Sequence, residues 1–364
     1  MTIENTVTAT CERFGKTIVR GVGGRIVNGT GWTLGLSALV GVMGAVLGPL
    51  ASAMAAEKTV TFAYQDMMTP IRVVMESGDL EKQTGYKVKW VKFGGGGDVI
   101  RAMASGNVDI GEAGSSPIAA AASQGLPIKL FWILDDIGDA EQLVARKGAG
   151  IASIKDLKGR TVAVPFVSTA HYQLTFALQE AGLGPKDVRV LNMRPPEIAA
   201  AWERGDIDAA FIWAPVLTGL KKTGTVLASA GDFAAKGKAT FDGIVATNAF
   251  LAAHPDFATT FVRLLAAADA DYARNGASWT AGSPQVAAIA KWTGAAPADV
   301  PEGLAAYRFP TLEGQASAQW LGGGAATALK STAEFLKAQG RVPDLAPDYG
   351  AFVTADVVKA AAGR

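Results

Sequence analysis

Short apolar segments alternate with amphipathic segments along most of the chain. Residues 58–65, 86–93 and 126–134 are short runs rich in β-branched and aromatic residues, which is typical of strands. The segments between them place apolar residues at helical spacing, for example at 98–106 after the glycines at 94–97. This order of strands and helices predicts a parallel sheet with helices on both faces.

The same alternation continues in the second half of the chain. Further strands are expected at 142–147, 161–167, 188–193 and 209–213, and helices at 171–182 and 196–205. From Lys238 onward the pattern becomes mostly helical, after one more expected strand at 241–248. The fold class that follows is α/β.

Two segments far apart in the chain have similar patterns. Residues 102–117 and 201–215 each contain a helix end, a Gly-Asn/Asp-Val/Ile-Asp turn, a strand and a proline. This repetition predicts two similar α/β lobes, each with a strand end followed by a helix start. Ligands of open α/β sheets bind at that edge. Chance similarity between common α/β turns is the alternative.

The N-terminal segment has the layout of a secretory signal. A basic segment at 13–25 precedes an apolar run at 32–50, and Ala51, Ala53 and Ala55 then provide small residues at alternate positions. A membrane anchor of about 20 residues is the alternative. We expect cleavage after Ala55 and a periplasmic location. Ordinary secretion is favoured over the twin-arginine route because no adjacent arginine pair precedes the apolar run.

Cysteine usage and charge exclude several classes of function. The only cysteine, Cys11, lies in the expected signal, so residues 56–364 have no thiol for a disulfide, a metal site or a nucleophile. These residues carry 30 Lys/Arg and 31 Asp/Glu. A nearly neutral chain argues against nucleic acid or an anionic membrane as a partner.

The residues available for catalysis are few. His171 follows Ser168 by three positions, which raises the possibility of a nucleophile beside its base. No G-x-S-x-G motif surrounds Ser168, and His254 is the only other histidine. The sequence lacks H-E-x-x-H, P-loop and G-x-G-x-x-G motifs. We therefore expect neither an enzyme, a metal site nor a cofactor.

Anion binding fits the small polar residues better. Gly94–Gly97, Ser115-Ser116 and Ser168-Thr169 each lie at an expected strand end just before a helix. Helix N-termini leave backbone N–H groups unpaired and carry a partial positive charge. Taken singly, each group could be an ordinary N-cap. Three of them at one sheet edge favour a site for a sulfonate, sulfate or carboxylate.

Several segments resemble one known family. They read AYQ (63–65), RAMASGNVDIGEAGSSPIAAAASQGLPI (101–128), GRTVAVPFVSTAHY (159–172), PPEIAAAWERGDIDAAFIWAP (195–215) and FLKAQGRVPDLAPDY (335–349). The chain from about 58 to 355 is similar to the taurine-binding periplasmic proteins of sulfonate ABC importers. These belong to the larger nitrate/sulfonate/taurine-binding group.

The resemblance implies a type II periplasmic-binding fold, with two lobes joined by two crossovers around a ligand cleft. Residues 56–147 plus 240–364 would form the first lobe and 148–239 the second. Closure of the cleft by a hinge motion would precede docking on a membrane permease. The resemblance also implies a monomer that captures taurine in the periplasm.

Taurine carries a sulfonate and an ammonium, and the resemblance implies a role for particular residues at each end. The expected sulfonate donors are Ser115, Ser116, Ser168, Thr169 and His171, with Gln65 at the end of the first strand. The expected ammonium acceptors are Glu141 and Asp242, and Trp213 would form a wall against the two methylenes. The sequence departs from the family pattern at Gly94–Gly97, where a more polar turn is usual, and at Glu112, where a neutral residue is usual.

Other readings remain open at this point. A binder of plain alkanesulfonates or nitrate-like anions is the nearest, and acidic residues in the cleft argue against it because such ligands have no amine. A pyrimidine-synthesis enzyme of the same fold would need a cysteine-rich iron motif, which residues 56–364 lack. No feature of the sequence supports a third reading, a structural or adhesion domain.

Overall fold

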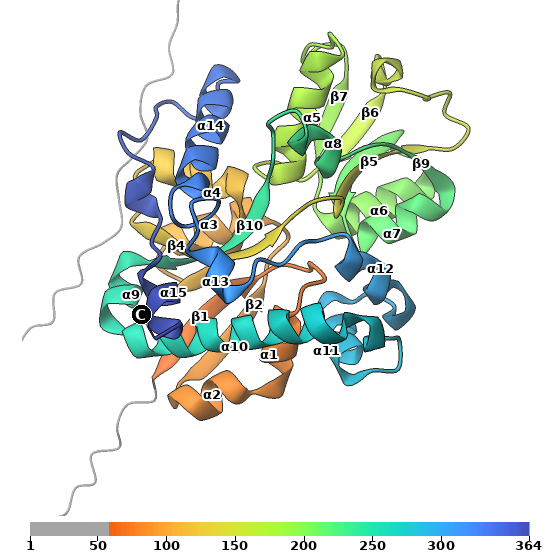
Figure 1. Cartoon of the computed structure of the whole chain (residues 1–364). Helices are drawn as coiled ribbons and strands as arrows, with labels where there is room; N and C mark the ends of the chain where they lie inside the picture. Colours follow the sequence, from red (N-terminus) through yellow and green to blue (C-terminus); the bar gives the residue numbers. More distant parts are fainter. Residues whose placement is uncertain (1–57, 364) are drawn as a thin grey trace, which may run out of the picture. The chain divides into compact units, whose positions relative to one another are not determined.

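Two five-stranded sheets organise residues 58–363, the part of the chain that this computed structural model describes (Figure 1). The expected signal, 1–55, lies outside the described residues. Among the described helices, none is long and apolar enough to cross a membrane.

The first sheet has the strand order β2-β1-β3-β10-β4. Its strands are β1 (Thr59–Tyr64), β2 (Lys87–Lys92), β3 (Ile110–Gly114), β4 (Ile128–Asp136) and β10 (Phe241–Thr247). β1, β2 and β3 are parallel, and β10 pairs antiparallel with both β3 and β4. We call this sheet and the helices packed on it the first lobe.

The second sheet has the strand order β7-β6-β8-β5-β9. Its strands are β5 (Glu141–Arg146), β6 (Thr161–Val164), β7 (Arg189–Asn192), β8 (Ala209–Trp213) and β9 (Gly224–Ser229). β6, β7 and β8 are parallel, and β5 pairs antiparallel with β8 and β9. We call this sheet and its helices the second lobe.

The two sheets repeat one arrangement, so the predicted internal repeat is confirmed. Each places its strands in the same order, with the strand that enters from the other sheet in fourth place. Asp109 and Asp208, the last residues of the two similar turns, have the same function. Their Oδ2 atoms accept the backbone N–H groups of Thr61 and Thr161, each at 2.8 Å.

Two expectations about the sheets were wrong. The sheets are mixed, because the fourth strand of each arrives from the other sheet and runs antiparallel to its neighbours. The first crossover was expected at 147, yet β5 already pairs with β8 and β9. The chain therefore enters the second sheet before Glu141.

Helices cover both sheets. The first lobe has α1 (Ile71–Ser77), α2 (Asp79–Thr84), α3 (Gly96–Ala104) and α4 (Ser115–Ser123), and the second has α5 (Thr169–Glu180), α6 (Pro195–Arg204), α7 (Val216–Thr223) and α8 (Ala230–Ala234). The later helices are α9 (Asn248–Ala253), α10 (Pro255–Asn275), α11 (Pro284–Thr293), α12 (Val300–Ala305), α13 (Leu312–Gln315), α14 (Gly324–Ala338) and α15 (Asp356–Ala361). Of these, α10 packs on α1, α2 and α15, and α14 packs on α4 (Figure 1).

A buried ion pair explains the unusual glutamate at position 112. Arg72 on α1 contacts Glu112 on β3 through two hydrogen bonds, Nη1 to Oε1 at 2.6 Å and Nη2 to Oε2 at 2.8 Å. Both side chains are fully buried. Glu112 Oε2 also accepts the backbone N–H of Gln65 at 3.0 Å. The charge at 112 therefore belongs to the structure of the first lobe.

Asp269 on α10 is another buried carboxyl, and it takes no part in the ion pair of Arg72 with Glu112. Burial raises its pKa well above the usual range, and Oδ2 has no hydrogen-bond partner among the described residues. When folding raises the pKa of a carboxyl, its contribution to the free energy of unfolding is largest below the pKa of the unfolded chain, about 4. The contribution falls as pH rises from there to the pKa of the folded protein. Asp269 therefore favours the folded state in acid.

We expect Asp269→Asn to flatten the fall of stability with rising pH. The amide cannot ionise, so the unfolded state no longer gains from ionisation above about pH 4. The free energy of unfolding of the variant, compared with that of wild type at the same pH, should therefore be higher at neutral pH than in acid. Urea unfolding of both proteins across this range measures the difference. Parallel pH profiles would mean that Asp269 has an ordinary pKa.

Candidate ligand-binding site

The two lobes meet where the helices α4 and α5 begin. A Cβ atom added at Gly114 would lie 2.7 Å from Thr169 Cγ2 and 3.2 Å from Asp242 Oδ1. Thr169 belongs to the second lobe, whereas Gly114 and Asp242 are paired residues of the first. Only a glycine at 114 permits this approach, which brings three parts of the chain together at one edge.

All nine residues expected at the site are buried: Gln65, Ser115, Ser116, Glu141, Ser168, Thr169, His171, Trp213 and Asp242. Their hydrogen bonds, however, divide them into groups with different roles.

Ser115 and Ser116 begin α4 and present donors at this edge. The extended Gly114 precedes them, and no side chain caps the helix. Ser115 Oγ accepts the backbone N–H of Phe241 at 3.4 Å, which leaves its own proton free to donate. Ser116 Oγ is buried without a partner among the described residues. Because the first-turn N–H groups of a helix also lack internal partners, this end of α4 suits an anion.

Glu141 and Thr169 form a buried pair at the start of β5 and α5. Thr169 Oγ1 donates to Glu141 Oε1 at 2.7 Å, and Glu141 Oε2 has no partner among the described residues. Burial first, and then the charge of Asp242, raise the pKa of Glu141 to about 8. Thr169 was expected to donate to a sulfonate, but in this structure its one proton goes to the carboxyl of Glu141.

Asp242 lies beside a second aspartate that the sequence analysis did not select. Asp242 on β10 pairs in register with Asp135 on β4, and both are buried. Burial and then the charge of Glu112 raise the pKa of Asp242 to about 7, while burial and the charge of Asp242 raise that of Asp135 well above its usual range. An acidic pair at the end of the apolar run 126–134 was the available signal.

Gln65 and Trp213 connect the site to the scaffold. Gln65 Nε2 donates to the backbone oxygen of Glu112 at 3.2 Å. Trp213 Nε1, at the end of β8, donates to Asp66 Oδ1 at 2.8 Å and so links the two lobes. Trp213 also stands opposite Glu141 in the sheet register. Its ring is therefore both part of the core and a contact between the lobes.

Ser168 was expected to donate to a sulfonate, but its hydroxyl hydrogen bonds to the backbone instead. Its hydroxyl donates to the backbone oxygen of Pro165 at 2.7 Å and accepts the backbone N–H of His171 at 3.0 Å. A serine hydroxyl has one proton, so none remains for a ligand. Ser168 is the N-cap of α5. The bond to His171 uses the backbone and not the imidazole, which also removes the nucleophile–base arrangement.

We expect Ser168→Ala to lower the free energy of unfolding by about 1 kcal/mol, the typical effect of removing an N-cap. Affinity for a ligand should change little because the hydroxyl contacts only the backbone. Urea unfolding and calorimetric titration of the variant measure the two quantities. A large loss of affinity at unchanged stability would return Ser168 to the binding site.

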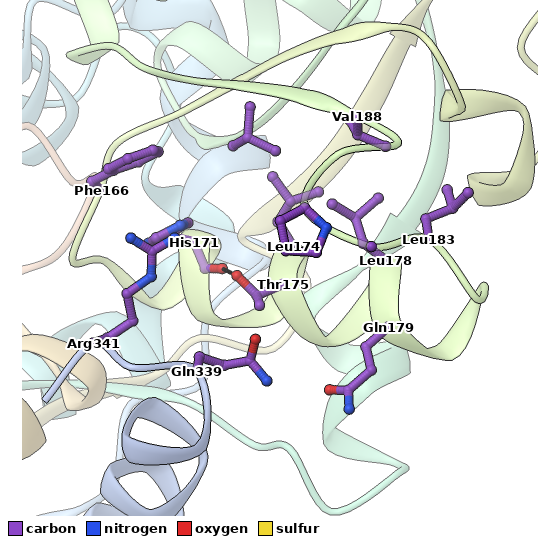
Figure 2. Close-up of a pocket in the computed structure, with 13 residues that line it drawn as sticks. Phe166, His171, Leu174, Thr175, Leu178, Gln179, Leu183, Val188, Gln339 and Arg341 are labelled. Carbon is purple, nitrogen blue, oxygen red and sulfur yellow. Dashed lines mark hydrogen bonds between the residues drawn. The ribbon is translucent and has the colours of Figure 1, made fainter. Parts of the chain in front are cut away.

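His171 was also expected to bind sulfonate, but it lines a cavity together with Phe166 and Arg341 (Figure 2). Its ring stacks on Phe166 with centroids 4.4 Å apart. Figure 2 shows Arg341 beside this pair and Leu174 and Leu178 farther along the cavity, whose volume is about 430 Å³. Burial lowers the pKa of His171 to about 4. The imidazole is therefore neutral, and Ser115 and Asp242 are not among the residues that line its cavity.

Gly94–Gly97 allow the two lobes to approach each other closely at this turn, because glycine has no side chain. A Cβ at Gly94 would lie 2.9 Å from Arg194 Cδ, and one at Gly97 would lie 3.1 Å from Val167 Cβ. Both neighbours belong to the second lobe, and Arg194 also pairs with Asp98 at 3.3 Å. Close approach of the two backbones explains why this turn lacks the usual polar side chains.

The site thus has two unlike ends. Unpaired hydroxyl and helix-terminal N–H donors of Ser115 and Ser116 can hold a negative group, and Asp242 and Glu141 can hold a positive one. Within residues 58–363, no group of three or more His, Cys, Asp or Glu side chains is arranged to hold a metal ion. The arrangement fits a small zwitterion.

Comparisons with known proteins show which family the chain is similar to. The family model described as NMT1/THI5 like matches residues 81–276. The chain is 38% identical over 300 residues to the taurine-binding periplasmic protein of Escherichia coli (strain K12), covering 82% of this chain and 92% of the relative. The putative aliphatic sulfonates-binding protein of Bacillus subtilis (strain 168) is 29% identical over 164 residues, 44% of this chain and 49% of that protein.

A solved structure confirms the expected two-lobe fold. The alkanesulfonate-binding protein SsuA from Xanthomonas axonopodis pv. citri, bound to MOPS, superimposes with a TM-score of 0.67. The alignment covers 82% of this chain and 99% of that chain at 24% identity, which supports the fold alone. The family model and the relative from Escherichia coli settle the family. The chain belongs to the NMT1/THI5-like family, in the group of periplasmic binding proteins that includes the taurine-binding protein of Escherichia coli.

Proposed function

We propose that this chain is the periplasmic substrate-binding receptor of an ABC importer, that it captures taurine, and that it delivers taurine to a permease in the inner membrane. The observation that carries the proposal is the pairing of unpaired donors with unpaired carboxyls in one buried site. The similarity to a taurine-binding periplasmic protein over most of both chains supports the same ligand.

In this proposal the ligand lies between the two ends of the site. The sulfonate accepts hydrogen bonds from the hydroxyls and N–H groups of Ser115 and Ser116. The ammonium donates to Asp242 and Glu141, whose Oε2 lacks a partner among the described residues. A plain alkanesulfonate would leave these carboxyls unmatched, so the site favours an aminosulfonate.

We further propose that the lobes close around the ligand by a hinge. The first lobe comprises residues 58–140 and 240–363 and the second 141–239, a division that follows the membership of β5 and β10 in the sheets. The hydrogen bond from Trp213 to Asp66 and the ion pair of Arg194 with Asp98 link the lobes and would break on opening. Binding and release, with no chemical step, are the whole of the proposed activity.

Calorimetric titration of residues 56–364 tests the proposed function. Taurine should bind more tightly than ethanesulfonate, and ethanesulfonate more tightly than sulfate, because only taurine matches both ends of the site. Tighter binding of ethanesulfonate than of taurine would assign the chain to the general sulfonate binders. Absence of binding to all three would refute the proposal.

Ser116→Ala should weaken taurine binding by about 1.5–3 kcal/mol, the range for a hydrogen bond to a charged group. Stability should stay level or rise, because Ser116 Oγ is a buried hydroxyl without a partner among the described residues. Ser168→Ala is the matched control, because it should lower stability and leave the affinity for taurine nearly unchanged. Equal affinities for wild type and Ser116→Ala would remove Ser116 from the sulfonate end.

A further inference from the structure

Four buried carboxyl groups lie on or next to strands of the two sheets near the proposed site. They belong to Asp66, Asp135, Glu141 and Asp242, which are between 0% and 6% exposed. Burial, and then the charges of these carboxyls, raise the pKa of Tyr307 well above its usual range. Tyr307 precedes Arg308, whose backbone pairs with Asp136, the residue after Asp135.

Few cations oppose these acids. The buried guanidinium of Arg72 is already paired with Glu112. Lys92 lies 4.0 Å from Asp66, and its side chain is 45% exposed. Among the described residues, Glu141, Asp135 and Asp242 form no ion pair. Buried carboxyls without a cation cannot all remain ionised, because desolvation and mutual repulsion both favour the protonated form.

The positions of these carboxyl groups indicate which of them carries a proton. Asp135 and Asp242 face each other across paired strands, and both Asp135 oxygens lack a donor partner among the described residues. Two carboxylates offer only acceptors, so they can hydrogen bond only when one carries a proton. Burial and the neighbouring charge raise the pKa of Asp135 well above that of a free carboxyl, which makes Asp135 the proton carrier. Asp242 and Glu141 then titrate near neutral pH, at about 7 and about 8.

We propose that Glu141 and Asp242 exchange their protons for the ammonium group of the ligand, so that pH sets the preference of the site between aminosulfonates and plain sulfonates. The inference rests on the proposed function. In the exchange each O–H proton leaves to the solvent, and the carboxylate that remains accepts an N–H of the ammonium. Asp135 keeps its proton and donates it to Asp242, so it acts as a positioning residue.

The direction of the pH dependence follows from this exchange. The titratable or charged groups that interact with Glu141 and Asp242 from neighbouring elements are Glu112, Arg72, Asp135 and Tyr307. Burial raises the pKa of both carboxyls, and the charges of Asp242 on Glu141 and of Glu112 on Asp242 raise them further. Binding an ammonium favours the ionised form and releases protons. Affinity for an aminosulfonate therefore rises about tenfold per pH unit for each proton released, up to about pH 8, and then levels off.

A plain sulfonate should respond in the opposite direction. Protonated Glu141 and Asp242 are neutral and can donate hydrogen bonds, whereas their ionised forms repel an anion and remain desolvated without a partner. Ethanesulfonate should therefore bind best at acid pH. The preference for taurine over ethanesulfonate should increase with pH.

Calorimetry in buffers of different ionisation enthalpy counts the protons directly. Titration of residues 56–364 with taurine should show proton release near pH 7, whereas ethanesulfonate should show none or uptake. Taurine binding without proton release and with a flat pH profile would overturn this inference and leave the proposed function intact. Failure of taurine to bind at any pH would instead refute the proposed function.

Glu141→Gln makes the test specific to one group. Glutamine imitates protonated Glu141, so the variant should bind taurine nearly as well as wild type at about pH 6 and at least tenfold more weakly at about pH 8. The number of protons released on taurine binding should also be smaller for Glu141→Gln than for wild type. Asp269→Asn removes a buried carboxyl outside the site and should leave proton release unchanged. An equal loss of affinity for Glu141→Gln at both pH values would contradict the exchange.

Discussion

Replacing Asp242 by asparagine should lower the affinity for taurine by about 2–5 kcal/mol, or about 30- to 5,000-fold. The amide keeps the shape of the carboxyl but leaves the ligand ammonium facing a neutral group inside a buried site. An ammonium that loses its hydration there needs a fixed carboxylate. Calorimetric titration at about pH 8, where Asp242 is ionised in wild type, should show the full effect.

The same variant should bind ethanesulfonate as well as wild type or better. An alkanesulfonate places an apolar group where the ammonium would lie, so removing the desolvated charge helps it. Opposite responses to the two ligands distinguish a specific effect from general destabilisation. Asp269→Asn is the matched control, because it replaces a buried carboxyl away from the site and should change neither affinity. Parallel losses of both ligands in Asp242→Asn would place Asp242 in the scaffold.

Glu112→Gln should lower the free energy of unfolding by about 3–5 kcal/mol, the effect of removing one partner of a buried ion pair. Arg72 is completely buried, and without Glu112 its guanidinium would keep only neutral partners, the backbone oxygens of Gln65 and Met67 and the sulfur of Met75. Urea denaturation measures the loss.

A double variant separates the lost attraction from the charge that is left unpaired. Arg72→Met combined with Glu112→Gln removes both charges from the core. It should be more stable than Glu112→Gln alone, since replacing a whole buried pair is often close to neutral. If the double variant were less stable than either single variant, the packing of Arg72 and not its charge would explain the effect.

The sequence predicted the fold well because its signals are local. Apolar runs such as 126–134 and 209–213 are long enough to identify buried strands, and the repeated turns at Asp109 and Asp208 identify equivalent strands in the two lobes. Strand direction and sheet membership are not local. β5 reads as one more strand of the first half, yet the path of the chain takes it into the second sheet, antiparallel to β8.

The site was predictable in location and less so in detail. Ser116 and Ser168 look alike in sequence, since each lies at the start of a helix. They differ in whether a backbone oxygen accepts the hydroxyl proton, as that of Pro165 does for Ser168. Asp135 and Tyr307 come from distant segments and meet only in the folded chain. The spacing of apolar and polar residues along the sequence does not predict such contacts.

A crystal structure of residues 56–364 with taurine, grown at about pH 8 where Glu141 and Asp242 can ionise, tests the central claim most directly. We predict one taurine between the lobes, with its sulfonate at the N-terminus of α4 on Ser115 and Ser116, and its ammonium within hydrogen-bond distance of Asp242 and Glu141. A taurine bound in the reverse orientation, or in the cavity of His171 and Arg341, would contradict the account.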